Sequence, residues 1–65
     1  MALSKNKLKE YRENARLSQE RMAEMVTVSR QIIIFIEKGR YIPSLELALN
    51  SAKLFDCRVE DMFGL

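Results

Sequence analysis

The sequence predicts an all-α fold in which five short helices pack as one compact unit. Three observations support this fold class. Apolar residues recur at helical spacing along the chain. Serine stands at three positions where it can cap the start of a helix, namely Ser18, Ser29 and Ser44. One proline and two glycines, with no repeat or low-complexity stretch, give no sign of a linker.

The first two predicted helices are short and follow each other closely. The first runs from about Lys5 to Ala15, and its inward face consists of Leu8, Tyr11, Ala15 and Arg12. The second begins after Ser18, where Glu20 complements the positive end of the helix dipole. Its inward stripe consists of Met22, Ala23 and Val26. The sequence therefore places two inward faces within the first 26 residues.

A third helix follows after a break in the periodicity at residues 26–29. Ser29 caps its start, and it runs to about Lys38, where Gly39 offers a left-handed stop. The segment from Arg40 to Pro43 reads as a loop, because the residue before a proline is disfavoured in the helical region. The second and third helices therefore meet through a tight turn.

The fourth predicted helix begins after Ser44. Its expected inward positions have the spacing of a single apolar face and are Leu45, Ala48, Leu49, Ala52 and Phe55. A last helical turn from Val59 to Phe63 is expected to close the core. We expect residues 1–65 to form one domain, because a chain of 65 residues has room for no more.

Composition excludes several classes of protein. Apolar residues make up 48% of the chain and charged residues 31%, which is typical of a soluble globular domain. The longest apolar run, residues 32–36, is far shorter than the roughly 20 residues that cross a bilayer, and no signal peptide is evident. We therefore expect a cytoplasmic protein without membrane contact.

The chemistry-bearing residues are equally restrictive. Cys57 is the only cysteine, so no internal disulfide can form, and the chain has no histidine. A zinc site, a catalytic triad and an imidazole general base are thereby excluded. We expect no enzyme activity, no metal and no cofactor.

Charge alone is a weak indicator here. The net charge is +2, and basic residues outnumber acidic ones in the first thirty positions. Only a basic face, and not a basic total, supplies contacts to phosphates. The spacing around Thr27 is more informative, because it meets the demands of a helix-turn-helix.

These demands concern the approach and the anchoring of two helices. A small residue is needed where the helices meet, and Ala23 supplies it. Apolar residues must anchor the second helix, and Val28, Ile33 and Ile36 have the required spacing. Polar residues must lie at its exposed start, which reaches base edges, and Ser29, Arg30 and Gln31 are there.

The same residues carry a resemblance to a known family. The stretches that carry it are 17–19, Ala23, 28–31, Ile33, 36–39 and 43–45, and the similarity extends from Leu8 to Phe63. This pattern resembles the Cro/phage-repressor regulators, also called the xenobiotic-response-element (XRE) family. The resemblance implies a five-helix, lambda-repressor-like DNA-binding domain in which helices 2 and 3 form the reading unit.

The resemblance also implies roles for individual residues. Base-reading positions fall on Ser29, Arg30, Gln31, Ile34 and Phe35. Phosphate contacts fall on Ser18, Gln19, Arg40, Tyr41 and Ser44. A structural ion pair between helices 1 and 3 falls on Arg12 and Glu37. Helix N-termini suit anions, arginine suits guanine, glutamine suits adenine, and apolar atoms suit the thymine methyl group.

The chain departs from the family pattern at several places. The family usually has glycine in three turns where this chain has Arg16, Thr27 and Asp56, and a β-branched threonine at positive φ is strained. Ser51 occupies a position where the family tends to bury an aliphatic residue. Ile32, Ile34 and Phe35 stand at positions of helix 3 that are typically polar in the family, so its exposed face is unusually apolar. Ile34 and Phe35 fit contact with either thymine methyls or a protein.

The function that we expect is sequence-specific binding of double-stranded DNA by a transcriptional repressor on a two-fold symmetric operator. The alternative is a protein-interaction module, such as an antitoxin-like partner that uses Ile34 and Phe35. We also expect a homodimer, because the apolar C-terminal residues exceed what so short a tail needs for its own core. Its interface is expected on the last helix, at Val59, Met62, Phe63 and Leu65.

Overall fold

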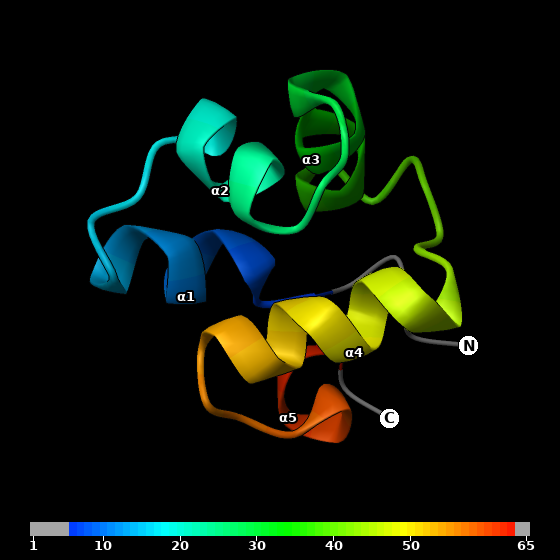
Figure 1. The fold of residues 1–65 in the computed structure, drawn as a ribbon. Helices are drawn as coiled ribbons and strands as arrows, with labels where there is room; N and C mark the ends of the chain where they lie inside the picture. The colour runs from blue at the N-terminus through cyan, green and yellow to red at the C-terminus, as the bar shows by residue number, and fades with distance from the viewer. Residues whose placement is uncertain (1–5, 64–65) are drawn as a thin grey trace.

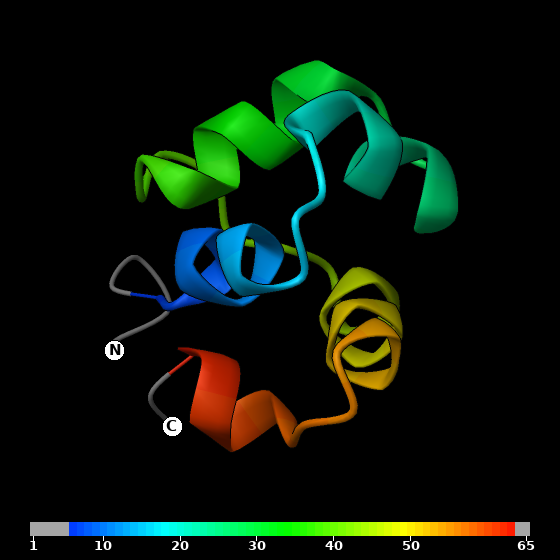
Figure 2. The ribbon, with the colours of Figure 1, turned by 90° about the vertical axis from the view of Figure 1, so that its left-hand side faces the viewer.

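A computed structural model of the chain describes residues 6–63, and in this range all regular secondary structure is helical. The five helices are α1 (Leu8–Asn14), α2 (Gln19–Met25), α3 (Arg30–Glu37), α4 (Leu45–Leu54) and α5 (Val59–Phe63). Two perpendicular views show α2 and α3 above, α4 and α5 below, and α1 between these two layers (Figures 1 and 2). The predicted all-α, five-helix architecture is confirmed.

The helix starts follow the serine pattern. The hydroxyl of Ser18 accepts a hydrogen bond from the Arg21 N–H at 3.0 Å, and that of Ser44 accepts one from the Leu47 N–H at 3.1 Å. The hydroxyl of Ser29 accepts a longer bond, 3.4 Å, from the Ile32 N–H. Each cap satisfies a backbone donor that has no partner within its helix. All three predicted caps are confirmed.

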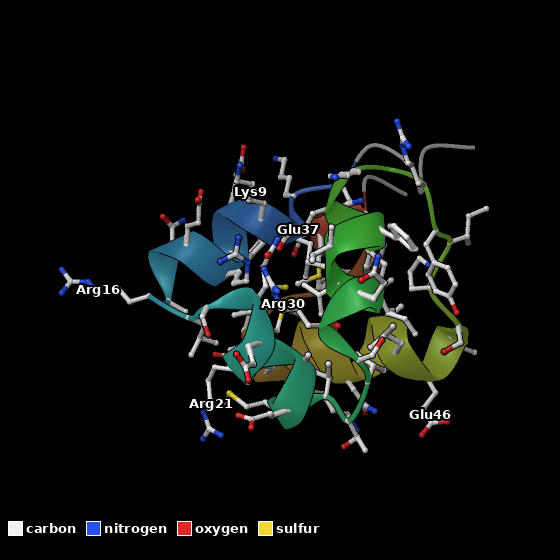
Figure 3. All side chains as sticks on the ribbon, turned by 90° about the horizontal axis from the view of Figure 1, so that it is seen from above. Lys9, Arg16, Arg21, Arg30, Glu37 and Glu46 are labelled. Atoms are coloured by element: carbon white, nitrogen blue, oxygen red, sulfur yellow. The ribbon has the colours of Figure 1, made fainter. Side chains whose placement is uncertain are left out.

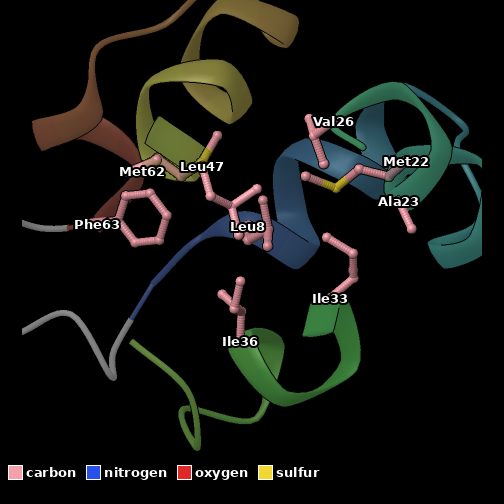
Figure 4. Packing of buried hydrophobic residues seen from close by; sticks show 10 residues of the cluster. Leu8, Met22, Ala23, Val26, Ile33, Ile36, Leu47, Met62 and Phe63 are labelled. Carbon is pink, nitrogen blue, oxygen red and sulfur yellow. The ribbon is translucent and has the colours of Figure 1, made fainter. Parts of the chain in front are cut away.

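The core receives side chains from every helix (Figure 4). Leu8 of α1 is fully buried, and around it lie Met22 from α2 and Ile33 and Ile36 from α3, together with Leu47, Met62 and Phe63 from the lower layer. Met22, Ala23 and Val26 are buried as predicted. Two expectations are wrong: Ala15 is exposed, and Ile32 is half-buried against the core. A domain of this size buries only about 60% of the surface of its unfolded chain, so few core positions are dispensable.

The prediction of a dimer interface on α5 is wrong for Met62 and Phe63. Their exposed fractions are 0% and 1%, because both side chains fill the lower part of the core of a single chain. Val59 is half-buried and packs against the same cluster, and Leu65 lies outside the described residues. The Lys7 N–H donates to the Met62 carbonyl at 2.8 Å, which ties α5 to the segment before α1.

The predicted inward face of α4 is also partly wrong. Leu45 and Leu49 are 74% and 44% exposed, and the buried residues are Leu47, Ala48, Ser51 and Ala52. The helix is thus rotated so that mostly small side chains face inward. Phe55, at the end of α4, packs against the core as expected.

The turns between helices contain left-handed residues. Arg16, Thr27 and Asp56 have φ values of 59°, 61° and 52°, and Gly39 has 71°. The first three are the positions at which this chain departs from the family's glycines. Positive φ costs a non-glycine residue roughly 1–2 kcal/mol, and a β-branched side chain makes Thr27 the most strained of the three.

None of the helices between residues 6 and 63 has the length and apolarity that a bilayer span requires.

Candidate nucleic-acid interface

The outer face of α3 is built by the helical repeat. Ile33 and Ile36 point into the core, which turns the positions between them outward. Arg30 lies one turn before Ile34, and Gln31 lies one turn before Phe35, so these four side chains share one face. Arg30 and Gln31 are exposed, Phe35 is 37% exposed and Ile34 is half-buried.

Figure 3 looks onto α2 and α3 from above and shows Arg30 on this side of the molecule. Arg16 and Arg21 project from one edge of the same view, and Glu46 projects from the opposite edge. Ser29 is exposed at the start of α3, and its hydroxyl caps the helix. The α3 face therefore combines donors at its start with apolar groups one turn later.

Ser18 and Gln19 lie at the start of α2. Ser18 is exposed, and its hydroxyl is used by the cap to the Arg21 N–H. Gln19 is half-buried, and its Nε2 donates a hydrogen bond to Glu37 Oε1 at 3.0 Å. One amide proton of Gln19 is therefore held inside the protein, and the second remains for another acceptor.

The other three positions of the expected phosphate set belong to the connection between α3 and α4. Arg40, Tyr41 and Ser44 are all exposed, whereas Pro43 between them is buried. The Arg40 N–H donates to the Phe35 carbonyl at 2.9 Å, which fixes the start of the connection to the end of α3. Pro43 lies one residue before the cap Ser44, and Ala48 lies four residues after it. Both are buried, which is the arrangement of a hydrophobic staple.

A buried charge network holds α1, α2 and α3 together. Arg12 Nε donates to Glu37 Oε2 at 2.7 Å, and Arg12 Nη2 donates to Glu37 Oε1 at 3.2 Å. A further bond runs from Arg12 Nη1 to the Leu17 carbonyl at 2.8 Å. The arginine and glutamate side chains are 10% and 5% exposed. Hydrogen bonding to the Glu37 carboxylate raises the pKa of Arg12 above its ordinary value, so the guanidinium stays charged.

A cleft of about 360 Å³ opens beside this network, lined by Lys9, Arg12, Gln19, Ile34, Glu37 and Lys38. Sequence analysis did not single out Lys38. It lies seven residues after Gln31, two helical turns further along the outer face of α3, so the helical repeat contained the signal. The hydrogen bond from Gln19 to Glu37 was also missed, because no spacing rule predicts contact between residues 18 positions apart.

Two further features of the described residues concern metal binding and thiol reactivity. Within residues 6–63, His, Cys, Asp and Glu side chains form no group of three or more that could hold a metal ion. Cys57 is half-buried, and burial raises the pKa of its thiol, so it is protonated at neutral pH.

Comparison with known proteins agrees with this geometry. Residues 8–62 match the family described as Helix-turn-helix. An uncharacterized HTH-type transcriptional regulator of Methanocaldococcus jannaschii is 56% identical over 59 residues, a match that covers 91% of this chain and 89% of that protein. The uncharacterized HTH-type transcriptional regulator YgzD of Bacillus subtilis is 51% identical over 61 residues, with 94% and 92% covered.

Solved structures of two regulators have the same fold. The SOS-response transcriptional repressor LexA of Eubacterium rectale superposes with a TM-score of 0.83 at 26% identity, over 95% of this chain and 65% of that chain. The restriction-modification controller protein C.AhdI of Aeromonas hydrophila superposes with a TM-score of 0.79 at 30% identity, over 88% and 86%. The chain belongs to the helix-turn-helix family, in its XRE-type branch of DNA-binding transcriptional regulators, and is not an enzyme.

Proposed function

We propose that the protein is a cytoplasmic, sequence-specific repressor that inserts α3 into the major groove of a two-fold symmetric operator, with one copy on each half-site. The observation that carries this proposal is the outer face of α3. Arg30 and Gln31, the first two residues of this helix, are both exposed. The start of the second helix is the part of a helix-turn-helix that reaches base edges.

The side chains on this face suit direct reading of bases. Arg30 offers a planar pair of donors for guanine, and Gln31 offers a donor and an acceptor for adenine. Ile34 and Phe35, one turn later, present apolar atoms of the kind that contact thymine methyl groups. Ser29, at the cap, keeps a short polar side chain against the groove edge. The half-site is therefore expected to contain guanine or adenine followed by thymine.

Backbone phosphates set the register of the reading helix on DNA. We assign this role to Ser18 and Gln19 at the start of α2, and to Arg40, Tyr41 and Ser44 after α3. All except the half-buried Gln19 are exposed. Phosphate contacts position a protein without carrying sequence information, so this set supplies affinity and the α3 face supplies sequence specificity.

The buried network ties the start of α2, with its part of the phosphate set, to the reading helix α3. Glu37, in the last turn of α3, accepts hydrogen bonds from Arg12 of α1 and from Gln19 of α2. A shift of α2 relative to α3 would have to break these bonds in a buried environment, which is costly. The phosphate contacts of α2 are thus held at a fixed offset from the base contacts of α3.

The size of the domain agrees with one copy for each turn of DNA. Its extents are 27 × 23 × 19 Å, and half-sites of helix-turn-helix dimers lie about 34–36 Å apart along the duplex. Two copies therefore fit side by side on one face of the operator.

Selection of bound fragments from random duplex DNA tests the proposal. We expect an inverted repeat with half-site centres about 10 base pairs apart, and an affinity that falls steeply with salt because phosphates are neutralised. Absence of enrichment over an unselected pool, together with a flat salt titration, would reject the proposal.

One observation favours a second candidate function, in which the face binds a protein. Phe35 remains exposed and Ile34 lines the adjacent cleft, so α3 has more apolar surface than base reading requires. An antitoxin-like role would use this surface to mask another protein. The salt titration separates the two functions, because an apolar protein contact lacks the steep loss of affinity with salt that phosphate binding gives.

A further inference from the structure

The side of α4 that faces solvent is more apolar than its role in the core explains. The helical repeat aligns Leu45, Leu49 and Lys53 in one outward ridge, beside which lie Glu46 and Asn50. All five residues are exposed. The inward side holds two alanines and a serine beside Leu47, so α4 turns two of its leucines toward water. Surface helices of globular proteins normally have the opposite polarity.

This ridge forms the most exposed apolar part of the described chain. Ile42, which precedes α4, is 65% exposed, and Leu45 is 74% exposed. We use the name α4 ridge for the apolar residues Ile42, Leu45 and Leu49 alone, without Lys53. None of the three belongs to the α3 face or to the phosphate set, although Ile42 and Leu45 adjoin Tyr41 and Ser44 of that set in sequence. An exposed apolar surface rimmed by polar residues typically marks a contact with another protein. DNA binding therefore leaves the α4 ridge unexplained.

We propose that the α4 ridge is the self-association surface of this protein, and that two copies pair their α4 helices antiparallel across a two-fold axis near Leu49. The order of charges along α4 carries the choice of partner. Glu46 lies in the first turn and Lys53 in the last. Antiparallel pairing brings Glu46 of one copy opposite Lys53 of the second copy, and Leu45 beside the aliphatic stem of that lysine.

Parallel pairing has the opposite electrostatics, because it sets Glu46 against Glu46 and Lys53 against Lys53. A two-fold axis perpendicular to the helix produces the antiparallel arrangement automatically, and it uses the same patch on both copies. In the antiparallel arrangement, the charges at the two ends of α4 are thus complementary to those of a second copy. An unrelated partner would have to supply the same pattern of one apolar ridge with opposite charges at its ends.

The contact is small, and this sets its strength. A helix of ten residues is about 15 Å long, whereas a stable interface buries about 800 Å² on each partner. One ridge of this length falls short of that area. We expect a weak dimer that forms with rising concentration, and that two adjacent half-sites on DNA would reinforce.

Sedimentation equilibrium without DNA, from micromolar to millimolar protein, measures this association. The double variant Leu45→Glu, Leu49→Glu is expected to weaken it at least tenfold. Met25→Glu is the matched control, because Met25 is 43% exposed at the end of α2 and lies outside the ridge. Because the substituted side chains are exposed, the double variant and Met25→Glu are both expected to melt near the temperature of the parent protein.

Charge reversal gives a second readout that a loss of folding cannot imitate. Glu46→Lys and Lys53→Glu should each weaken the dimer, and the double reversal should restore it. Leu49→Cys, in a background with Cys57→Ser, should form an intermolecular disulfide under copper-phenanthroline oxidation in air. Met25→Cys in the same background should not. These outcomes together support the antiparallel geometry.

Three results would overturn the proposal: a monomer at millimolar concentration, a dimer as strong with both glutamates as with Met25→Glu, or a charge reversal without rescue. The proposal does not depend on DNA binding. A protein that binds its operator as separate monomers contradicts only the α4 ridge. A protein that forms this dimer but does not bind duplex DNA contradicts only the proposed function.

Discussion

In α3, the large apolar side chains Ile33 and Ile36 point into the core while Arg30 and Gln31 face solvent. In α4 the distribution is partly reversed, because Leu45 and Leu49 face solvent while small side chains face inward. Both helices begin with a serine cap and have amphipathic periodicity. Periodicity therefore defines the two faces of a helix, whereas the space left by its neighbours decides which face is buried.

The largest effect is expected from the anchor of α3. Glu37→Ala leaves the guanidinium of Arg12 buried without its partner, and should lower the free energy of unfolding by about 3–5 kcal/mol. Urea denaturation followed by circular dichroism measures this change. Replacing Arg12 and Glu37 together by leucines should cost less than the single change, because no unpaired charge remains.

The exposed pair Arg21 and Glu24 is the control for this prediction. Its side chains are 61% and 62% exposed, so Arg21→Ala should change stability by less than about 1 kcal/mol. If Glu37→Ala is as mild as Arg21→Ala, the buried network does not anchor α3.

The rotation of α4 is tested by two leucines two positions apart. Leu47→Ala should cost about 2–4 kcal/mol of unfolding free energy, because the Leu47 side chain is buried in the core. Leu49→Ala should cost less than about 0.5 kcal/mol, since that side chain already contacts water. Thermal melts at low protein concentration, where the chain is monomeric, measure both changes. Equal losses would mean that α4 has the orientation predicted from its sequence.

Smaller changes are expected at the α3 face, and they concern binding. Gln31→Ala should cost about 1–3 kcal/mol on the preferred site, and relax the choice at one base pair while non-specific binding stays nearly the same. Arg40→Ala should weaken binding to all duplexes alike and reduce the salt slope by about one unit. Fluorescence anisotropy on specific and scrambled duplexes separates the two. Uniform loss from both variants would mean that α3 lies on the backbone without reading bases.

The smallest effect is expected in the turn between α2 and α3. Thr27→Gly should stabilise the fold by about 0.5–1 kcal/mol, because glycine adopts positive φ without the strain of a β-branched residue. Gly39→Ala, also at positive φ, should destabilise by a similar amount and serves as the reciprocal control. An unchanged melting temperature of Thr27→Gly would show that the turn tolerates threonine without strain.

Local signals predicted most of the fold. Caps and helical spacing depend on neighbours in sequence, and they correctly identified the starts of α2, α3 and α4 and the whole of α5. They failed where distant packing decides. The family resemblance marked position 51 as buried, but helical spacing did not reveal that Leu47 faces the core while Leu45 does not, because both lie on plausible stripes of α4. The prediction of an exposed apolar surface on the last helix was wrong, because Met62 and Phe63 are buried in the small core of a single chain.

Sequence patterns predict the contacts of the site residues less completely than they predict the helices. Spacing predicts that Arg30 and Gln31 share the outer face of α3, and the structure has them there. The partner of Gln19 depends on how α2 crosses α3, which no local pattern encodes. The roles of these residues toward DNA stay predictions.

The attachment of α3 through Glu37 has an evolutionary consequence. The outer side chains Arg30, Gln31, Ile34 and Phe35 are absent from the buried core cluster and from the Arg12 network. Mutations at these four positions can therefore accumulate without large losses of folding stability. A duplicated copy of the gene could drift to a new operator while its scaffold is preserved, and a designer could exchange the same four residues as a cassette.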